Sequence, residues 1–213
     1  MRWIGRRDFL TSGAMTLAGM HGIGQQSEVS GEKASHRRLI AAARAVELIR
    51  DLNLSVLSKE SGYIGIIGKS ALEVEVEGRR LAAQSQNYYM LTRDRPINYL
   101  HWLASDDTHI LIEGGPVDYF IFHEDGNVER KTLGMRFAEG QRPVVAVPAG
   151  SWKALRLHPE AEYALTANAL SPEFTPDRVR IGEGGGWVRR FADKAPWATE
   201  GFLREMIGPN WQS

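Results

Sequence analysis

Between Gly62 and Leu170 the chain contains a series of short segments in which the apolar residues follow a period of two. Residues 72–77 read Leu-Glu-Val-Glu-Val-Glu, and this alternation predicts a half-buried strand. A turn is predicted at residues 124–127, between two strands of a hairpin. Many short strands separated by turns predict a sandwich or closed barrel rather than alternating strands and helices. The other predicted strands are residues 87–92, 98–103, 108–112, 117–123, 128–133, 144–147, 152–157 and 163–169.

The segments on either side of this region have different patterns. Apolar residues at helical spacing predict a helix over residues 36–50, after a polar linker at 25–35. Residues 171–186 contain two Ser/Thr-Pro pairs and three consecutive glycines. No Lys-Ser or Lys-Thr follows these glycines, so they indicate a linker rather than a phosphate loop. A short closing helix is predicted at residues 197–207.

The first 24 residues have the order of an export signal. Arg6 and Arg7 precede Phe9 and Leu10, and a mildly apolar stretch follows. This arrangement resembles a twin-arginine (Tat) signal peptide, which implies cleavage near Gln25 and a periplasmic or otherwise exported protein. The stretch is too short and too rich in glycine for a permanent span, so we expect no stable membrane insertion after cleavage.

Composition narrows the classes of function further. The 213 residues include 26 Lys and Arg against 26 Asp and Glu, so the chain lacks the basic excess that nucleic-acid binding uses. No nucleic-acid partner is therefore expected. The absence of cysteine excludes disulfides, thiolate catalysis and cysteine-bound metals.

Two stretches resemble the paired motifs of the cupin superfamily. The first runs from His101 through Asp107 to Gly114 and has the carboxylate-to-glycine spacing of the first cupin motif. The second is Pro148-Ala149-Gly150-Ser151-Trp152-Lys153. Over residues 45–182 the chain is similar to the fifth cupin family (Cupin_5), whose domain has no known function. The stretches that carry this similarity are Glu60-Ser61-Gly62-Tyr63, Tyr88-Tyr89-Met90-Leu91, Gly140-Gln141-Arg142-Pro143 and Ser171-Pro172-Glu173-Phe174.

The resemblance implies an all-β fold, a double-stranded β-helix or cupin (RmlC-like) jelly-roll barrel with a pocket at its mouth, often paired as a homodimer. We therefore expect a cupin domain at residues 36–182, which begins with the N-terminal helix, and a C-terminal helical extension at 183–213. The fold does not define a reaction, because related barrels include enzymes and plain binding proteins.

The resemblance also indicates how the pocket differs from a metal site. Metal-binding cupins use three histidines and a carboxylate, but here Leu103 and Lys153 stand at two of the histidine positions, beside His101 and Asp107. We therefore expect no cofactor. Lys153 is predicted to contact Asp107, with His101 hydrogen-bonded alongside, which would leave a fixed cation for a carboxylate or other oxygen-rich group.

Two alternatives remain open at the level of the sequence. Strand alternation turns His109 to the same side as Asp107, so His101, Asp107 and His109 would form an atypical site for a divalent metal ion. Alternatively, His101 paired with Asp107 and facing Tyr63 or Tyr99 would suit epimerase-like or isomerase-like proton transfer. The candidate catalytic residues are then His101, Asp107 and Tyr63. The candidate residues for a small-molecule ligand are His101, Asp107, His109, Lys153, Trp152 and Tyr99.

Overall fold

The computed structural model describes residues 22–213, so most of the predicted export signal lies outside the described residues. The chain divides into two units, residues 1–38 and 39–213. The described part of the first unit, residues 22–38, belongs to helix α1 (Gly22–Asp51). The helix predicted at 36–50 therefore begins earlier than expected. Residues 25–35, predicted as a linker, are helical.

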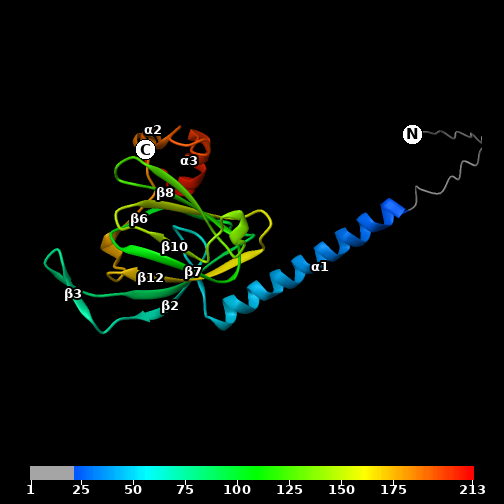
Figure 1. Cartoon of the computed structure of the whole chain (residues 1–213). Coiled ribbons are helices and arrows are strands. Elements are labelled where there is room, and N and C mark those ends of the chain that lie inside the picture. Colours follow the sequence, from blue (N-terminus) through cyan, green and yellow to red (C-terminus); the bar gives the residue numbers. More distant parts are fainter. Residues whose placement is uncertain (1–21) are drawn as a thin grey trace, which may run out of the picture. The chain divides into compact units, whose positions relative to one another are not determined.

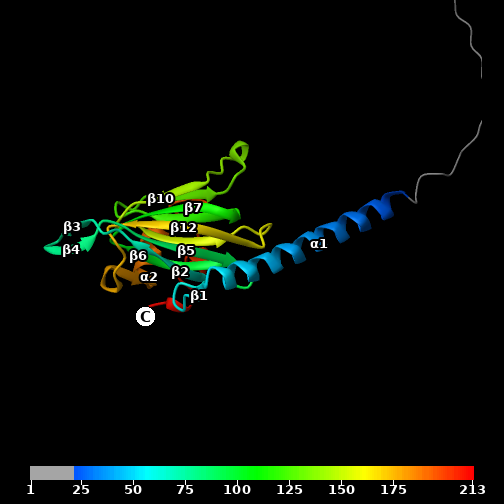
Figure 2. The same cartoon turned by 90° about the horizontal axis from the view of Figure 1, so that it is seen from below.

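The second unit is built from two antiparallel sheets, whose strand order departs from sequence order as in a jelly roll (Figure 1). Figure 2 shows most of the first sheet, with β10, β7, β12, β5, β2 and β1 in succession. Its strands are β1 (Ser55–Val56), β2 (Tyr63–Lys69), β5 (Ser85–Thr92), β12 (Tyr163–Ser171), β7 (Asp106–Gly114) and β10 (Val144–Val147). The second sheet contains, in spatial order, β13 (Val179–Ile181), β6 (Ile97–Leu103), β11 (Trp152–Leu157), β8 (Val117–Phe122) and β9 (Val128–Leu133).

The predicted alternation is visible in the burial of β7. Asp107 and His109 are buried between the sheets, whereas Ile110 and Ile112 are exposed on the outer face. The hairpin turn at residues 124–127 is confirmed between β8 and β9, and Asp125 Oδ1 accepts a 2.9 Å hydrogen bond from Asn127 N. Strand β8 is buried on both faces, because residues outside the barrel cover its second face.

Two sets of helices cover the outer faces of the sheets. Ala45 and Leu48 of α1 pack with Met90 and Leu165 on the first sheet. On the second sheet, α2 (Gly185–Phe191) and α3 (Glu200–Ile207) cover an aromatic cluster that includes Phe122. The predicted C-terminal helix is therefore present. Three short 3₁₀ turns complete the unit: η1 (Phe137–Glu139), η2 (Pro176–Arg178) and η3 (Gly208–Asn210).

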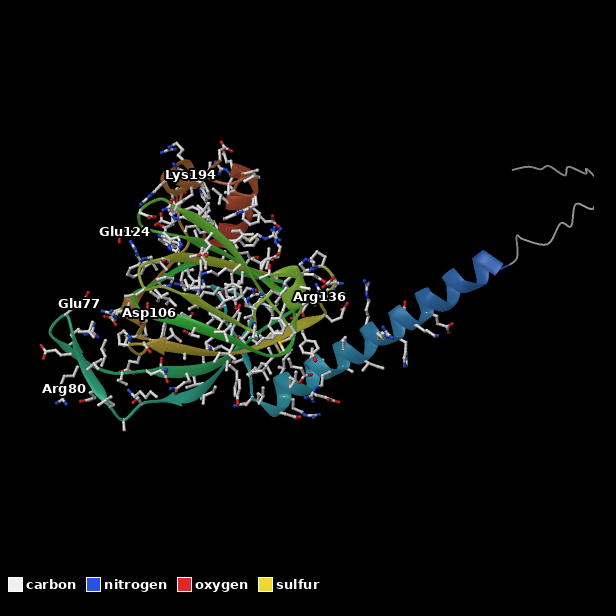
Figure 3. The ribbon with its side chains drawn as sticks, in the orientation of Figure 1. Glu77, Arg80, Asp106, Glu124, Arg136 and Lys194 are labelled. Atoms are coloured by element: carbon white, nitrogen blue, oxygen red, sulfur yellow. The ribbon has the colours of Figure 1, made fainter. Side chains whose placement is uncertain are left out.

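Two local predictions are wrong. Strand β3 (Glu73–Val76) pairs only with β4 (Arg79–Ala82) in a separate hairpin, so it is exposed rather than half-buried. Figure 3 shows Glu77 and Arg80 on this hairpin, where Glu77 Oε2 accepts a 2.6 Å hydrogen bond from Arg178. The predicted linker at 171–186 contains strand β13 and the start of α2, because tertiary contacts outweigh its glycine content. Within the described residues, no helix has the length and hydropathy needed to cross a membrane.

Candidate functional site

A cavity of about 490 Å³ lies between the inner faces of the two sheets. Its lining is partly apolar and partly polar, and the most buried polar groups are histidine, carboxylate, amide and ammonium groups. A cavity of this size is large enough for a small organic molecule. The apolar lining residues are Leu57, Ile64, Ile66, Leu103, Leu170 and Phe174, and the polar ones used below are Glu60, Lys69, Asn98, His101, Asp107, His109, Lys153 and Glu173.

A bulge in β6 determines which of its residues face the cavity. Across from β11, His101 pairs with Lys153 and Asn98 pairs with Leu155, so β6 contains one extra residue. A bulge of this kind shifts the alternation of side chains by one position. Asn98 and His101 therefore both line the cavity although they are three residues apart.

Lys153, Asp107 and His109 form a buried hydrogen-bonded chain. The Lys153 ammonium donates to Asp107 Oδ2 in a short ion pair, which is the contact expected from the sequence. His109 Nε2 donates to the same Asp107 oxygen at 2.9 Å. The ring of His109 also meets that of Tyr119 edge to face, with 5.0 Å between the ring centroids. All three charged or ionisable groups are at most 3% exposed.

The protonation of this chain follows from its surroundings. Burial would raise the pKa of Asp107, but the attraction of His109 and Lys153 outweighs burial and holds this pKa well below that of an ordinary aspartate. Burial lowers the pKa of His109, against the attraction of Asp107. Near neutral pH, His109 is therefore a neutral ring that donates from Nε2 to an ionised Asp107, and Lys153 supplies the counter-charge.

His101 has a different partner from the one expected. Its Nδ1 lies 2.8 Å from the carbonyl oxygen of Tyr99, and its Nε2 lies 3.6 Å from Glu60 Oε2. His101 makes no hydrogen bond to Asp107 in the described structure. Burial lowers the pKa of His101, and Lys153 acts in the same direction while Glu60 opposes it.

Three residues singled out in the sequence lie outside this cavity. Tyr63 is on the outer side of the first sheet, where its hydroxyl donates to Asp94 Oδ2 at 3.3 Å. The ring of Tyr99 lies against Gly208 of the C-terminal segment. Trp152 neighbours Lys153 on β11, and adjacent strand residues point to opposite faces, so Trp152 joins the aromatic cluster under α2.

Trp152 instead borders a second cavity of about 470 Å³ on the outer face of the second sheet. The guanidinium of Arg180 stacks there on Trp102, 4.1 Å from the ring centroid. Asp106, labelled in Figure 3, is exposed and does not line the inner cavity, and its Oδ1 accepts from Ala149 N at 2.8 Å. Trp152 and Lys153 are neighbours in the second motif, and they therefore lie on opposite faces of the second sheet.

The residues of the inner cavity do not fit a divalent metal ion. The Lys153 ammonium pairs with Asp107 and would repel a cation there, and Leu103 offers no ligand atom. Across the residues that the structure describes, no group of three or more histidine and carboxylate side chains has a metal-binding arrangement. The set His101, Asp107 and His109 is therefore not assembled as a metal site.

Sequence reasoning missed Glu60 and Asn98 as residues of the cavity. Asn98 Nδ2 donates to the backbone oxygen of Glu60 at 3.1 Å, which holds the loop before β2 against β6. Glu60 stands in one of the stretches that carry the family resemblance, and this was its only signal. Asn98 faces the cavity because of the bulge in β6, and the sequence pattern does not reveal this bulge.

Comparison with known proteins defines the class of this protein. Residues 46–181 match the Cupin_5 family, described as Cupin superfamily (DUF985). The chain belongs to this family, and its two-sheet jelly roll is the cupin fold. The matched region contains every residue of the inner cavity named above and ends before α2.

Individual relatives agree with this assignment. The chain is 30% identical to an uncharacterised protein of Saccharomyces cerevisiae over 177 residues, which cover 76% of this chain and 80% of the yeast protein. A hypothetical protein from Leishmania major has a similar structure, with a TM-score of 0.65 and 24% identity over 76% of this chain and 97% of that one. A Shewanella oneidensis protein gives a TM-score of 0.60 and 20% identity over 75% of this chain and 94% of that one. Both structures support the fold alone.

Proposed function

We propose that this cupin binds a small polar or oxygen-rich molecule in the inner cavity, independently of any metal. The observation that carries the proposal is the buried chain of Lys153, Asp107 and His109 at the polar end of a cavity of about 490 Å³. Buried polar groups are costly to maintain unless they are paired, so a polar cavity floor is typical of binding sites. The apolar wall would receive the less polar part of the ligand.

The ion pair between Lys153 and Asp107 also limits which ligand groups the cavity can attract. Because Asp107 neutralises Lys153, the ammonium is not the free cation that a carboxylate ligand would need. Ligand recognition would then rely on hydrogen bonds from the polar floor and on shape, as is usual for small-molecule sites.

A second candidate function is proton transfer of the epimerase or isomerase type. His101 Nε2 is directed to Glu60 at 3.6 Å within the cavity, and a neutral imidazole next to a carboxylate is a suitable general base. In this form of the proposal the pair is His101 with Glu60, and Asp107 and His109 form the supporting chain. Tyr63 would take no part, since its hydroxyl is bonded to Asp94.

We further propose that the protein is exported through the twin-arginine pathway and forms a homodimer. The export proposal rests on Arg6 and Arg7 ahead of Phe9 and Leu10. Exposed Ile110, Ile112 and Val144 on neighbouring strands support the homodimer, because a group of exposed apolar side chains favours association. Amino-terminal sequencing of the exported fraction tests the first proposal, and an intact Met1 form found only in the cytosol contradicts it.

Native mass spectrometry of the protein purified from its own host tests ligand binding. We expect a bound compound on the wild type and its loss in Leu103→Trp, which fills the cavity. Leu72→Trp is the matched control, because Leu72 is 67% exposed on the β3–β4 hairpin. No bound compound, or the same compound on both variants, contradicts the proposal. Stoichiometric metal that is lost in His101→Ala contradicts its metal-independent part.

A further inference from the structure

The orientation of His101 fixes which of its nitrogens can meet a ligand. Nδ1 lies 2.8 Å from the Tyr99 carbonyl oxygen, and a carbonyl only accepts hydrogen bonds. Nδ1 must therefore carry the proton. In the neutral ring, Nε2 then presents a lone pair, and this atom is directed to Glu60.

The carboxylate of Glu60 provides a second hydrogen-bond acceptor next to Nε2 of His101. Its Oε2 lies 3.6 Å from His101 Nε2, and the side chain is only 15% exposed. An ionised carboxylate has no proton to donate, so the two atoms face each other as acceptors. Within residues 22–213, no side chain or backbone group donates a hydrogen bond to the Glu60 carboxylate. The arrangement is complete only when a donor from another molecule approaches both atoms.

The charges of the cavity point to the nature of this donor. Lys153 pairs with Asp107, and Lys69 pairs with Glu173 at 3.0 Å. Among the cavity-lining residues described, this leaves the carboxylate of Glu60 without a cation. A partly buried carboxylate without a counter-charge attracts a positively charged ligand group, since pairing offsets the cost of desolvation.

We infer that the cavity recognises its ligand through a protonated amine, which donates one hydrogen bond to Glu60 and one to Nε2 of His101. This inference rests on the proposed binding function and narrows its ligand class. Charge-assisted hydrogen bonds are stronger than neutral ones, so the amine would be the main anchor. The remainder of the ligand would contact the apolar wall formed by Leu57, Ile64 and Leu103.

Three probes that share one ring test the inference by isothermal titration: benzylamine, benzyl alcohol and benzoate. We expect benzylamine to bind about tenfold more tightly than either of the others, as a charge-assisted hydrogen bond predicts. In Glu60→Gln this preference should disappear. Glu75→Gln is the matched control, because Glu75 lies on the exposed β3–β4 hairpin and should leave the preference unchanged.

Benzoate or benzyl alcohol binding as tightly as benzylamine overturns the inference, and so does the absence of binding by all three probes. An unchanged preference in Glu60→Gln overturns it too, provided that circular dichroism shows the variant to be folded. These results differ from a failure of the proposed function. If a host compound remains bound to the wild type and is lost in Leu103→Trp, the binding function stands even when the amine preference is absent.

Discussion

Lys153 is 2% exposed, and its ammonium depends on one carboxylate for its charge balance. Taking a lysine out of water is unfavourable, and the ion pair with Asp107 offsets this cost only while both partners are present. Asp107 in turn holds the ring of His109 through Nε2. At the scale of single residues, the polar floor of the cavity is therefore a coupled unit.

Removing one member of the pair should be more damaging than neutralising both. We expect Lys153→Met to lower the free energy of unfolding by about 3–5 kcal/mol, because Asp107 is left as a buried charge without its cation. The double variant Lys153→Met with Asp107→Asn should recover most of this loss. Urea unfolding of the three proteins measures the difference. A single variant that is no less stable than the double one contradicts this account.

The two buried histidines predict how stability changes with pH. The pKa of His101 and that of His109 lie below the ordinary value of 6.5 in the folded protein, so the unfolded chain binds protons first as the pH falls. Stability is therefore complete above the unfolded pKa and declines below it. Asp107 adds to this only at lower pH, below its own unfolded pKa.

We expect the free energy of unfolding to decrease between about pH 7 and about pH 5, as buried neutral histidines require. In His109→Gln the decrease should be smaller, since one of the two groups is absent. Urea midpoints measured across this range provide the check. A wild-type protein whose stability is constant over the range shows that the histidines do not have lowered pKa values.

At the scale of elements, neighbouring segments differ in how much they contribute to folding. The β3–β4 hairpin pairs only with itself, although Leu81 and Ala82 at its end are buried and Ala82 N donates to Glu173 at 2.7 Å. The end of the hairpin is thus anchored to the barrel while its tip is exposed (Figure 3).

Two leucines near the anchored end of the hairpin, one buried and one exposed, test how much burial contributes to stability there. Leu81→Ala should cost about 2–5 kcal/mol of unfolding free energy, because the side chain is buried. Leu72→Ala should change it by less than about 0.5 kcal/mol, as expected for an exposed position. Chemical unfolding of both variants gives the comparison, and equal losses would mean that the segment just before β3 is covered in solution.

The C-terminal helices contribute in a different way, by covering the second sheet. Phe122 contacts Trp187 and Phe191 of α2, with centroid separations of 4.8 and 5.3 Å. These helices lie beyond the region matched to the family, yet they bury the outer face of β8. Without them the aromatic side chains of that face would meet water.

Phe191→Ala tests this covering role. Phe191 is 1% exposed, and the truncation should cost about 3–5 kcal/mol through the cavity that it leaves. Phe174→Ala removes the same atoms from a side chain that is 43% exposed, so its cost should be much smaller. Thermal unfolding distinguishes the two, and an unaffected Phe191→Ala would show that α2 does not stabilise the sheet.

At the scale of the whole molecule, the outer face of the first sheet carries exposed apolar residues next to the edge strand β10. Edge strands with apolar neighbours tend to associate unless they are protected. The proposed homodimer would cover this face. Ile110 of β7 and Val144 of β10 are paired in register, so they form one continuous apolar area.

We expect light scattering to give the mass of two chains for the wild type at micromolar concentration. The double variant Ile110→Lys with Ile112→Lys should be monomeric, since it places charges on the apolar area. Leu72→Lys, a change of similar chemistry on the exposed hairpin, should remain dimeric. A strictly monomeric wild type contradicts the proposed dimer.

The sequence alone determined the features that depend on neighbouring residues. A period of two predicts strands and the side to which each residue points, so Asp107 and His109 were correctly assigned to one face. The turn at residues 124–127 also follows from local chemistry. The resemblance to cupins placed Lys153 at a ligand position, from which its contact with Asp107 follows.

The contacts between distant surfaces depend on the tertiary structure. The approach of Glu60 to His101 requires a loop and a strand that are distant in the sequence, and the bulge in β6 brings in Asn98 through its pairing with β11. The alternation of residues 72–77 is the same as in a half-buried strand, but no other element covers it. The alternation of apolar and polar residues predicts which face of a strand each side chain is on. Burial depends on whether a second element packs against that face.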